Sequence, residues 1–377
     1  MTKKSSTYHL FVIAAFIGVL LTFLVFYLVD LGIGTESRLV GRCYDGSVIE
    51  GESFLDDFNR VVYQNNATLS VIEEYRYRLF DTVNHKNVLS GKNDFLFEVS
   101  DEQNGYHYLE DYKGKCSFSD DELAAILNNL QQTKASYEER GAEYLLVILP
   151  NAQTVYSDYM PAYLGDISDQ TRLDGLEQYL RQNGFTCFVN LTDDLRAYRE
   201  QEHRSYKEER LLYNNTENSL NSLGFYYVYR SVYDRFSSTV MSSTAVLEPR
   251  HLSFYQHLTA GKAIAQQAGL VSLQNKSVSL SKDTKLHYRF TWDTGLAAKT
   301  MLLPFDFSVN VSGSPPLLLQ TTDSWTRAQL EPFFSNTFSN VTYQTDLSDN
   351  SEVFEKAAPR LVIRFVYENE LSQLLPQ

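Results

Sequence analysis

The sequence predicts an α/β protein: a three-layer α/β/α domain with a mostly parallel sheet, preceded by one N-terminal transmembrane helix. Short apolar runs typical of buried strands occur at residues 144–149 (YLLVIL), 317–319 (LLL) and 361–367 (LVIRFVY). Segments with helical periodicity lie between them, and strands that alternate with helices favour a parallel sheet covered on both faces. A third observation, an uncharged apolar run at residues 10–29, predicts the membrane helix.

The membrane helix is expected at residues 10–29, LFVIAAFIGVLLTFLVFYLV, a length that crosses a bilayer core. Lys3 and Lys4 favour a cytoplasmic position for residues 1–9. We therefore expect a single-pass protein of the cell membrane whose C-terminal part is extracytoplasmic. Cleavage after the apolar run is an open alternative, although residues 30–34 make a poor cleavage site.

Residues 30–90 are expected to form a stalk or helical lead-in, because apolar side chains recur at helical intervals in 55–62 and 71–83. The extracytoplasmic domain is expected to cover residues 91–377. Its first elements are a turn at 91–94, a short strand at 95–97 and a loop at 106–114.

The regular part of the domain begins at a capping box formed by Ser119 and Glu122. The sequence then predicts a helix, the strand 144–149, a second helix through Leu173 to Leu180, and a strand at 185–189. Residues 211–213 are expected to be a short strand or turn, followed by an aromatic helix at 219–236.

The segment 240–312 is interpreted as a possible insertion beside the main sheet, with helical stretches in 249–270 and strands in 286–311. The regular alternation then returns: strand 317–319, helix 325–338, strand 341–343, helix 352–358 and strand 361–367. Sites in such sheets lie at the carboxyl ends of the strands. We therefore expect the functional residues in the turns that follow these strands.

Composition excludes several classes of function. The formal net charge is -14, which disfavours nucleic acid as a partner. No His, Cys, Asp or Glu cluster has metal-ligand spacing, and no phosphate loop or dinucleotide motif occurs, so neither a metal nor a cofactor is expected. Cys43, Cys116 and Cys187 allow one disulfide or three unpaired thiols.

The turn Thr322-Asp323-Ser324 lies between a predicted buried strand and a predicted helix. A serine there can expose its hydroxyl beside the unpaired N–H groups of the helix, as nucleophilic hydrolases and acyl transferases require. The alternative is that Asp323 or Ser324 simply caps the helix.

With these elements in order, the chain from about residue 91 to 371 resembles the SGNH-hydrolase-like family of alginate O-acetylation proteins, also called the DHHW family. Five segments carry the resemblance, in the family's order: GKNDFLF (91–97), LPNAQTVYSDYMP (149–161), TENSLNSLGFYYVY (216–229), TDSW (322–325) and VIRFVYENEL (362–371). The third segment is similar to the family's threonine-aspartate-x-histidine-tryptophan-asparagine pattern, and the fourth to its glycine-aspartate-serine-phenylalanine.

The resemblance implies a Ser-His-Asp arrangement that transfers acetyl groups on extracellular polysaccharide, and a membrane-bound acetyl-donor protein as partner. Ser324 falls on the nucleophile, Glu217 on the aspartate and Ser219 on the histidine. Asn221 and Gly224 are retained. Asn221 is a candidate substrate-binding residue, as are Asn151 and Tyr156 of the second segment.

Replacement of the histidine by Ser219 decides the expected mechanism. A serine hydroxyl is a weak nucleophile without a base, and a carboxylate cannot substitute for the imidazole it orients. The base could instead be His251 or His257 from the unassigned segment, or Glu217 acting directly. A structural role for each histidine is the alternative.

Three functions remain open from the sequence. The protein is a catalytically impaired relative that binds glycan or serves as a scaffold in polysaccharide O-acetylation, an active serine-dependent O-acetyltransferase or acetylesterase, or a structural surface protein on a borrowed fold. The first explains the loss of the histidine together with other motif residues, and whether the chain is an enzyme is left open.

Overall fold

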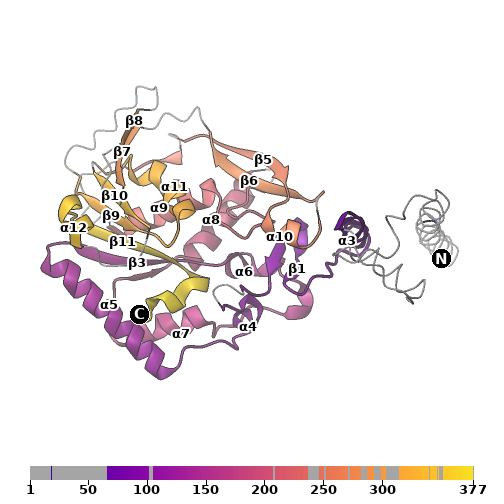
Figure 1. The fold of residues 1–377 in the computed structure, drawn as a ribbon, viewed down its shortest axis with the longest axis horizontal. Helices are drawn as coiled ribbons and strands as arrows, with labels where there is room; N and C mark the ends of the chain where they lie inside the picture. Colours follow the sequence, from indigo (N-terminus) through magenta and orange to yellow (C-terminus); the bar gives the residue numbers. More distant parts are fainter. Residues whose placement is uncertain are drawn as a thin grey trace, which may run out of the picture. The chain divides into compact units, whose positions relative to one another are not determined.

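The computed structural model describes residues 18, 66–101, 105–206, 209–236, 246–249, 252–270, 272–281, 287–292, 299–302, 314–338, 340–345, 347 and 351–376 (Figure 1). The expected cytoplasmic residues 1–9, the expected anchor 10–29 apart from Gly18, and most of the expected stalk lie outside these ranges, as do Cys43 and His251. Among the described residues, no helix is long and apolar enough to cross a membrane.

The chain divides into two compact units, residues 1–75 and 76–377. The first unit is described only at Gly18 and in the first part of helix α3 (Asn66–Phe80). The second unit holds the sheet and all the segments that resemble the acetylation family.

The centre of the second unit is a seven-stranded sheet with the order β4-β3-β11-β9-β10-β7-β8. Its strands are β3 (Glu143–Leu149), β4 (Phe188–Asn190), β7 (His287–Trp292), β8 (Lys299–Leu302), β9 (Leu317–Gln320), β10 (Val341–Gln344) and β11 (Leu361–Tyr367). All neighbouring pairs are parallel except β7 and β8. The predicted α/β class with a mostly parallel sheet is therefore confirmed.

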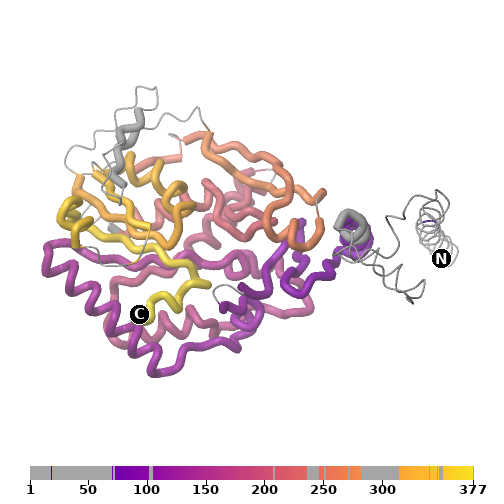
Figure 2. Tube along the Cα trace, viewed as in Figure 1, coloured from indigo at the N-terminus to yellow at the C-terminus, as the bar shows by residue number. Residues whose placement is uncertain are grey.

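The last strand of the chain lies in the middle of the sheet. β11 pairs with β3 along seven residues, from Leu361 opposite Glu143 to Tyr367 opposite Leu149, and with β9 on its other side. Figure 2 shows the yellow C-terminal segment running beside the purple β3. Segments more than 200 residues apart in sequence therefore end at the same edge of the sheet.

Both faces of the sheet are covered by helices, which makes three layers. Along β3, Leu145, Val147 and Leu149 belong to one buried core, while the alternate residues Tyr144, Leu146 and Ile148 belong to the other. The first core is completed by α6 (Ala152–Val155), α8 (Thr192–Ser205), α9 (Ser222–Phe236) and α11 (Ser324–Phe334). The second is completed by α5 (Asp120–Glu139), α7 (Arg172–Gln182) and α12 (Ser351–Ala357). A strand buried on both faces is apolar at every position, and this explains the YLLVIL run.

Local signals set several helix starts. Ser119 and Glu122 form the predicted capping box at the start of α5, with reciprocal side-chain-to-backbone hydrogen bonds. Thr171 and Asp174 form a second capping box at the start of α7. Each box satisfies two donors that a bare helix end leaves unpaired.

Smaller elements complete the second unit, and some differ from the sequence predictions. They are β1 (Val88–Ser90), β2 (Leu96–Glu98), α4 (Tyr108–Tyr112), β5 (Phe254–Ala260), α10 (Ala263–Gln267) and β6 (Gln274–Leu280), with 3-10 turns at Lys92–Asp94, Ser157–Tyr159, Ala162–Leu164 and Glu368–Leu374.

The predicted loop at 106–114 is wrong, because α4 lies there; burial of Tyr108 and Tyr112 stabilises a short turn whose sequence is polar. The sequence predicted helical stretches in 249–270, but the α-helix described there is the short α10. Residues 254–260 form β5 instead, which pairs with β6 in a separate two-stranded sheet. Leu211 and Leu212 form no strand, and Tyr213 makes a single bridge to Leu220.

Candidate functional site

The five segments that resemble the acetylation family come together at the carboxyl edge of the sheet. Ring contacts join the first two segments to the residues just before the third: Phe95 stacks on Tyr156 with 4.8 Å between ring centroids, and Tyr156 meets Tyr213 edge-on at 5.9 Å. The Tyr213 hydroxyl donates a 2.6 Å hydrogen bond to the carbonyl of Pro150, at the end of β3. Segments far apart in sequence therefore form one assembly at the edge where parallel sheets place their sites.

Glu368 ties the end of β11 to the end of β3. Its buried carboxylate accepts a 2.6 Å hydrogen bond from the backbone nitrogen of Asn151 and hydrogen bonds of 2.8 and 3.0 Å from the Thr154 hydroxyl. Burial raises the pKa of Glu368 to about 7, although the bonds from Asn151 and Thr154 oppose the shift. This carboxyl therefore changes charge close to neutral pH.

A second buried carboxyl, Asp111, lies beside Glu368. Its Oδ2 accepts a very short hydrogen bond from the Tyr106 hydroxyl, and its Oδ1 accepts one of 2.7 Å from the backbone nitrogen of Arg172. The Asn151 side chain donates to the Tyr106 hydroxyl at 3.3 Å. Burial raises the pKa of Asp111. Asn151 thus contacts both carboxyl groups, one directly and one through Tyr106.

Three more carboxyl groups, those of Glu98, Asp101 and Glu370, lie along the same edge of the sheet. Burial, followed by the charge of Asp101, raises the pKa of Glu98 to about 7. Burial also raises the pKa of Glu370, whose carboxyl lies near Thr322 and Asp323. We call Glu98, Asp101, Asp111, Glu368 and Glu370 the acidic edge. It connects the carboxyl ends of β2, β3 and β11 to the turn that holds Ser324.

The loop between Tyr213 and Asn221 holds the residues aligned with the family aspartate and histidine. The Asn214 side-chain amide donates to Ser219 Oγ at 2.9 Å and, more weakly, to Glu217 Oε2 at 3.4 Å. Asn214 is almost fully buried and its own Oδ1 has no hydrogen-bond partner in the described part of the chain. The structure thus brings Glu217 and Ser219 together through Asn214.

Fully buried Asn215 holds this loop in place. Its side chain donates to the Asp94 carbonyl at 2.8 Å and accepts from the Lys276 backbone nitrogen at 2.6 Å. Its carbonyl accepts from the Leu96 backbone nitrogen at 2.8 Å. The loop is thereby joined to the first family segment and to β6.

Asn221 begins helix α9. Its Oδ1 accepts from the backbone nitrogens of Leu223 and Gly224 at 3.0 and 3.2 Å, and its Nδ2 donates to the Leu211 carbonyl at 2.7 Å. A Cβ on Gly224 would lie 2.4 Å from the Leu212 carbonyl oxygen, so only glycine fits there. Both retained motif residues therefore fix the position of α9; whether Asn221 also contacts substrate stays a prediction.

Ser324 is the first residue of α11 and is exposed. Asp323 caps the helix, because its Oδ1 accepts from the Thr326 backbone nitrogen at 2.9 Å and its Oδ2 from the Thr326 hydroxyl at 2.6 Å. The capping interpretation is confirmed for Asp323, and it leaves the Ser324 hydroxyl open to solvent beside the N-terminus of the helix.

Within the described part of the chain, the Ser324 hydroxyl has no hydrogen bond to Glu217, Ser219 or a histidine. His257 lies on β5, opposite Ser277, with its ring 5.1 Å from that of Tyr255, and its buried Nδ1 has no partner among these residues. Glu217 and Ser219 are brought to the same edge as Ser324, but no described contact joins them to it.

Tyr156 is fully buried, and its hydroxyl accepts a hydrogen bond of 2.9 Å from the Leu212 backbone nitrogen. Asn151 is 8% exposed. In the described structure Tyr156 supports the loop, and Asn151 supports the acidic edge. Their predicted substrate-binding role stays a prediction.

Sequence reasoning missed most of the acidic edge. Glu98, Asp101 and Asp111 come from short elements without strong periodicity, and their proximity to Glu368 arises only when β2, α4 and β11 pack together. The available signal was position, because Glu98 directly follows the first family segment and Glu370 lies within the last.

The acidic edge is not arranged for a metal. Within the residues that the structure describes, no group of three or more His, Cys, Asp and Glu side chains could hold a metal ion.

Cys116 and Cys187 are both free thiols.

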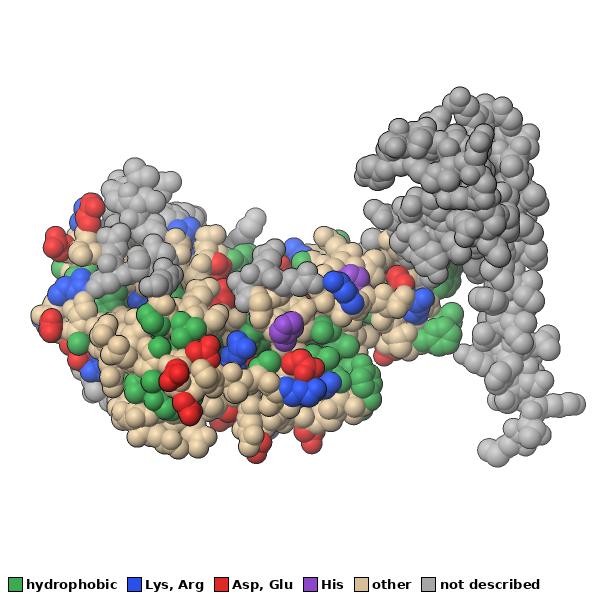
Figure 3. Space-filling model, turned by 60° about the horizontal axis from the view of Figure 1, so that its bottom comes forward, with side chains coloured by type: hydrophobic (Ala, Val, Ile, Leu, Met, Phe, Trp, Pro, Cys, Tyr) green, Lys and Arg blue, Asp and Glu red, His purple; other side chains and the backbone are tan. Residues whose placement is uncertain are grey.

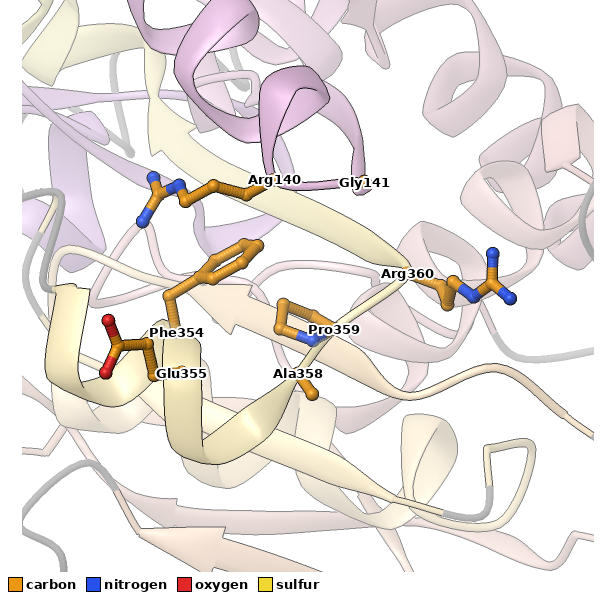
Figure 4. Close-up of a pocket in the computed structure, with 7 residues that line it drawn as sticks. All are labelled: Arg140, Gly141, Phe354, Glu355, Ala358, Pro359 and Arg360. Atoms are coloured by element: carbon orange, nitrogen blue, oxygen red, sulfur yellow. The ribbon is translucent and has the colours of Figure 1, made fainter.

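The molecular surface, unlike the acidic edge, shows no clustering of one sign of charge on the face that Figure 3 displays. On the face shown in Figure 3, acidic and basic side chains are interspersed, and neither sign covers it. A hollow of about 530 Å³ lies at the amino ends of β3 and β11, between Arg140, Phe354 and Arg360. In Figure 4 the Arg140 side chain extends over the Phe354 ring, and Arg360 points away from it. This hollow is at the edge of the sheet opposite to Ser324 and is not part of the candidate site.

No family model and no curated protein matches the chain. Solved structures similar to it include the O-acetyltransferase domain of Pseudomonas putida AlgJ, with 13% identity over 76% of this chain and 92% of that one and a TM-score of 0.44. Bacillus cereus PatB1 has 12% identity over 77% of this chain and 98% of that one, with a TM-score of 0.49.

A DHHW family protein from Eubacterium siraeum has 13% identity over 67% of this chain and 86% of that one, with a TM-score of 0.45. At such identities these likenesses concern the fold and assign no role to any residue. The chain is thus similar to solved structures that include an O-acetyltransferase domain and a DHHW family protein.

Proposed function

We propose that this protein is a membrane-anchored, extracytoplasmic relative of polysaccharide O-acetylation proteins that binds glycan or serves as a scaffold and is catalytically impaired. The observation that carries the proposal is that Ser324 is exposed while Ser219, and not a histidine, stands at the position aligned with the family histidine. A hydroxyl at that position, bound by the Asn214 amide, cannot accept the nucleophile's proton as an imidazole does.

The surroundings of Ser324 support contact with a glycan. Trp325, the next residue, is 49% exposed although it is a large aromatic side chain. An exposed indole presents an apolar face on which the C–H groups of a sugar ring can pack, and its N–H remains free to donate. The half-buried members of the acidic edge, Glu98, Asp101 and Glu370, can accept hydrogen bonds from sugar hydroxyls, whereas Asp111 and Glu368 are buried.

The anchor, the location and the partners belong to the same proposal. Residues 10–29 would hold the chain in the cell membrane, with the domain outside. Its partners would be a polysaccharide and a membrane-bound acetyl-donor protein. The net charge of -14 supports the absence of a nucleic-acid partner.

An active O-acetyltransferase or acetylesterase is the second candidate, favoured by one observation. The Ser324 hydroxyl is exposed on the first turn of α11, where unpaired backbone N–H groups can stabilise an oxyanion. Its base would be Glu217, His251 or His257. A structural role alone is disfavoured, because Ser324 is not buried.

Tryptophan fluorescence tests the glycan-binding proposal. The chain has two tryptophans, so a Trp292→Phe variant leaves Trp325 as the sole indole reporter. We expect its emission to shift saturably with neutral, N-acetylated or uronic oligosaccharides. Isothermal titration calorimetry, which needs no indole reporter, should show that Trp325→Ala weakens binding at least tenfold. Trp325→Phe, which keeps an aromatic face, is the matched control. Unchanged binding by Trp325→Ala would reject this site.

A further inference from the structure

The 3-10 turn Glu368–Leu374 follows β11 and is attached to the rest of the domain at both ends. The Asn369 side chain donates to the Tyr108 hydroxyl of α4 at 2.9 Å. At the other end, the Asn129 side chain of α5 donates to the Leu374 carbonyl at 2.9 Å. These bonds are neutral. The buried carboxyl of Glu368, at the start of the turn, adds an attachment that can change its charge.

The contacts of the Glu368 carboxyl require a proton on it. Oε2 lies 2.6 Å from the Asn151 backbone nitrogen and 2.8 Å from Thr154 Oγ1, and Oε1 lies 3.0 Å from the same Oγ1. The backbone nitrogen and the hydroxyl supply one hydrogen each, so two hydrogens serve three contacts. A protonated Oε1 provides the third hydrogen by donating to Thr154 Oγ1. The arrangement therefore matches the neutral form of Glu368.

The ionisable groups that face Glu368 oppose a negative charge there. Burial is the largest cause of its raised pKa, and the charges of Asp111 on α4 and Asp174 on α7 raise the pKa further. Three phenol groups, which provide no positive charge, also interact with it: those of Tyr106, Tyr108 and Tyr213. Loss of the proton would place a second buried carboxylate beside Asp111.

The neighbouring arginines do not compensate for such a charge. Arg172 of α7 lies over the Tyr106 ring, with its guanidinium carbon 5.3 Å from the ring centroid. Arg196 of α8 donates to the Thr154 carbonyl through Nε and Nη2, at 3.1 and 2.6 Å. Neither forms an ion pair with Glu368 in the described structure. A buried carboxylate without a basic partner is costly, and water outside the fold would solvate it.

We infer that the turn Glu368–Leu374 is a pH-sensitive latch, which a proton on Glu368 holds closed against α4 and α6 and which opens when that proton is lost. Glu370 of the same turn lies near Thr322 and Asp323, so opening would withdraw a carboxyl from the turn that presents Ser324. The latch goes beyond the proposed function, because it requires neither a glycan nor an acetyl group.

The direction and size of the effect follow from the two states of the carboxyl. The pKa of Glu368 is about 7 in the closed turn and 4.5 in its ordinary state. The closed form is therefore fully favoured below pH 4.5 and loses this advantage as the pH rises to about 7. Proton linkage then predicts that the open population increases roughly fiftyfold between pH 5 and pH 7.5.

Hydrogen–deuterium exchange mass spectrometry of the full-length chain tests the latch. Labelling at pH 5 and pH 7.5 uses times scaled for the intrinsic pH dependence of amide exchange. We expect the protection of peptides from 368–375, and of the Asn151 amide, to fall roughly fiftyfold, because local opening controls their exchange. The protection of α9, which reports unfolding of the whole domain, should change much less.

Two variants assign the effect to one carboxyl. Glu368→Gln keeps an acceptor for Asn151 and a donor for Thr154 but cannot ionise, so its change in protection should not exceed about threefold. Glu370→Gln, the matched control, removes the other carboxyl of the turn and should keep a change of at least about tenfold.

Three results would overturn the inference: an equal pH dependence in Glu368→Gln and the parent, loss of the change in Glu370→Gln, or parent protection of 368–375 that does not fall relative to α9. The last comparison needs only the parent, so it applies even where a variant does not fold. None of these results depends on glycan binding at Trp325 or on acetylation at Ser324.

Discussion

The backbone nitrogen of Asn151 donates a 2.6 Å hydrogen bond to the carboxylate of Glu368, and this bond joins the carboxyl ends of two neighbouring strands. The residues come from segments 217 positions apart. Because the carboxyl group is buried and also accepts from Thr154, it fixes the geometry of the edge on which Ser324 lies.

Glu368→Ala should therefore destabilise the fold. The substitution leaves the Asn151 nitrogen and the Thr154 hydroxyl buried without an acceptor, at a cost of about 2 kcal/mol or more in the free energy of unfolding. Glu368→Gln keeps one acceptor oxygen and should cost less. Urea denaturation checks the order; equal stability of Glu368→Ala and the parent would contradict this role.

Substitution of Asp323 should lower the stability of the fold, whereas substitution of Ser324 should not. Asp323→Ala removes the cap of α11 and should cost about 1 kcal/mol in the free energy of unfolding, whereas Asp323→Asn keeps an acceptor and should cost less. Ser324→Ala, at an exposed position, should leave the unfolding midpoint unchanged. A large loss of stability in Ser324→Ala would mean that the serine has a structural role.

Asn221→Ala should destabilise α9. It removes the acceptor for Leu223 and Gly224 together with the donor to the Leu211 carbonyl, and the expected cost is about 2 kcal/mol. Asn221→Asp keeps the cap and should be closer to the parent. If Asn221→Ala lost glycan binding at unchanged stability, its predicted contact with substrate would be supported instead.

Stability should depend on pH through Glu331, which lies on α11. Burial raises the pKa of Glu331 from 4.5 to about 7, so the folded state holds this proton over a range in which the unfolded chain releases it. Its contribution is fully present below pH 4.5 and is lost as the pH rises to about 7, by on the order of 1 kcal/mol per pH unit.

Glu331→Gln should therefore reduce the decline in unfolding free energy between pH 5 and pH 8, approximately the range of this loss. Glu139→Gln, an exposed change on α5, is the control. An identical pH dependence in Glu331→Gln and the parent would show that this carboxyl is not responsible.

The elements predicted best from the sequence are those with strong local signals. The Ser119 capping box and the apolar runs of β3, β9 and β11 specify their structure within a few residues, because a strand buried on both faces must be apolar throughout. The order of the five family-like segments along the chain also predicted the position of the turn that holds Ser324.

What the sequence did not predict depends on tertiary packing. Residues of α4 look like a loop, yet burial of Tyr108 and Tyr112 stabilises a helical turn. The residues of β5 are all exposed or half-buried, so the strand lacks the buried apolar run of a core strand and forms through its pairing with β6. The acidic edge arises where three separate elements meet, so no local pattern records it.

The central claim is that Ser324 lacks an effective base. The most direct test is intact mass spectrometry of the full-length chain after exposure to an activated acetyl ester, with Ser324→Ala in parallel. We predict no acetyl adduct or turnover beyond that of Ser324→Ala. An adduct on the parent that disappears in Ser324→Ala would contradict the claim and would direct the search for the base to Glu217, His251 and His257.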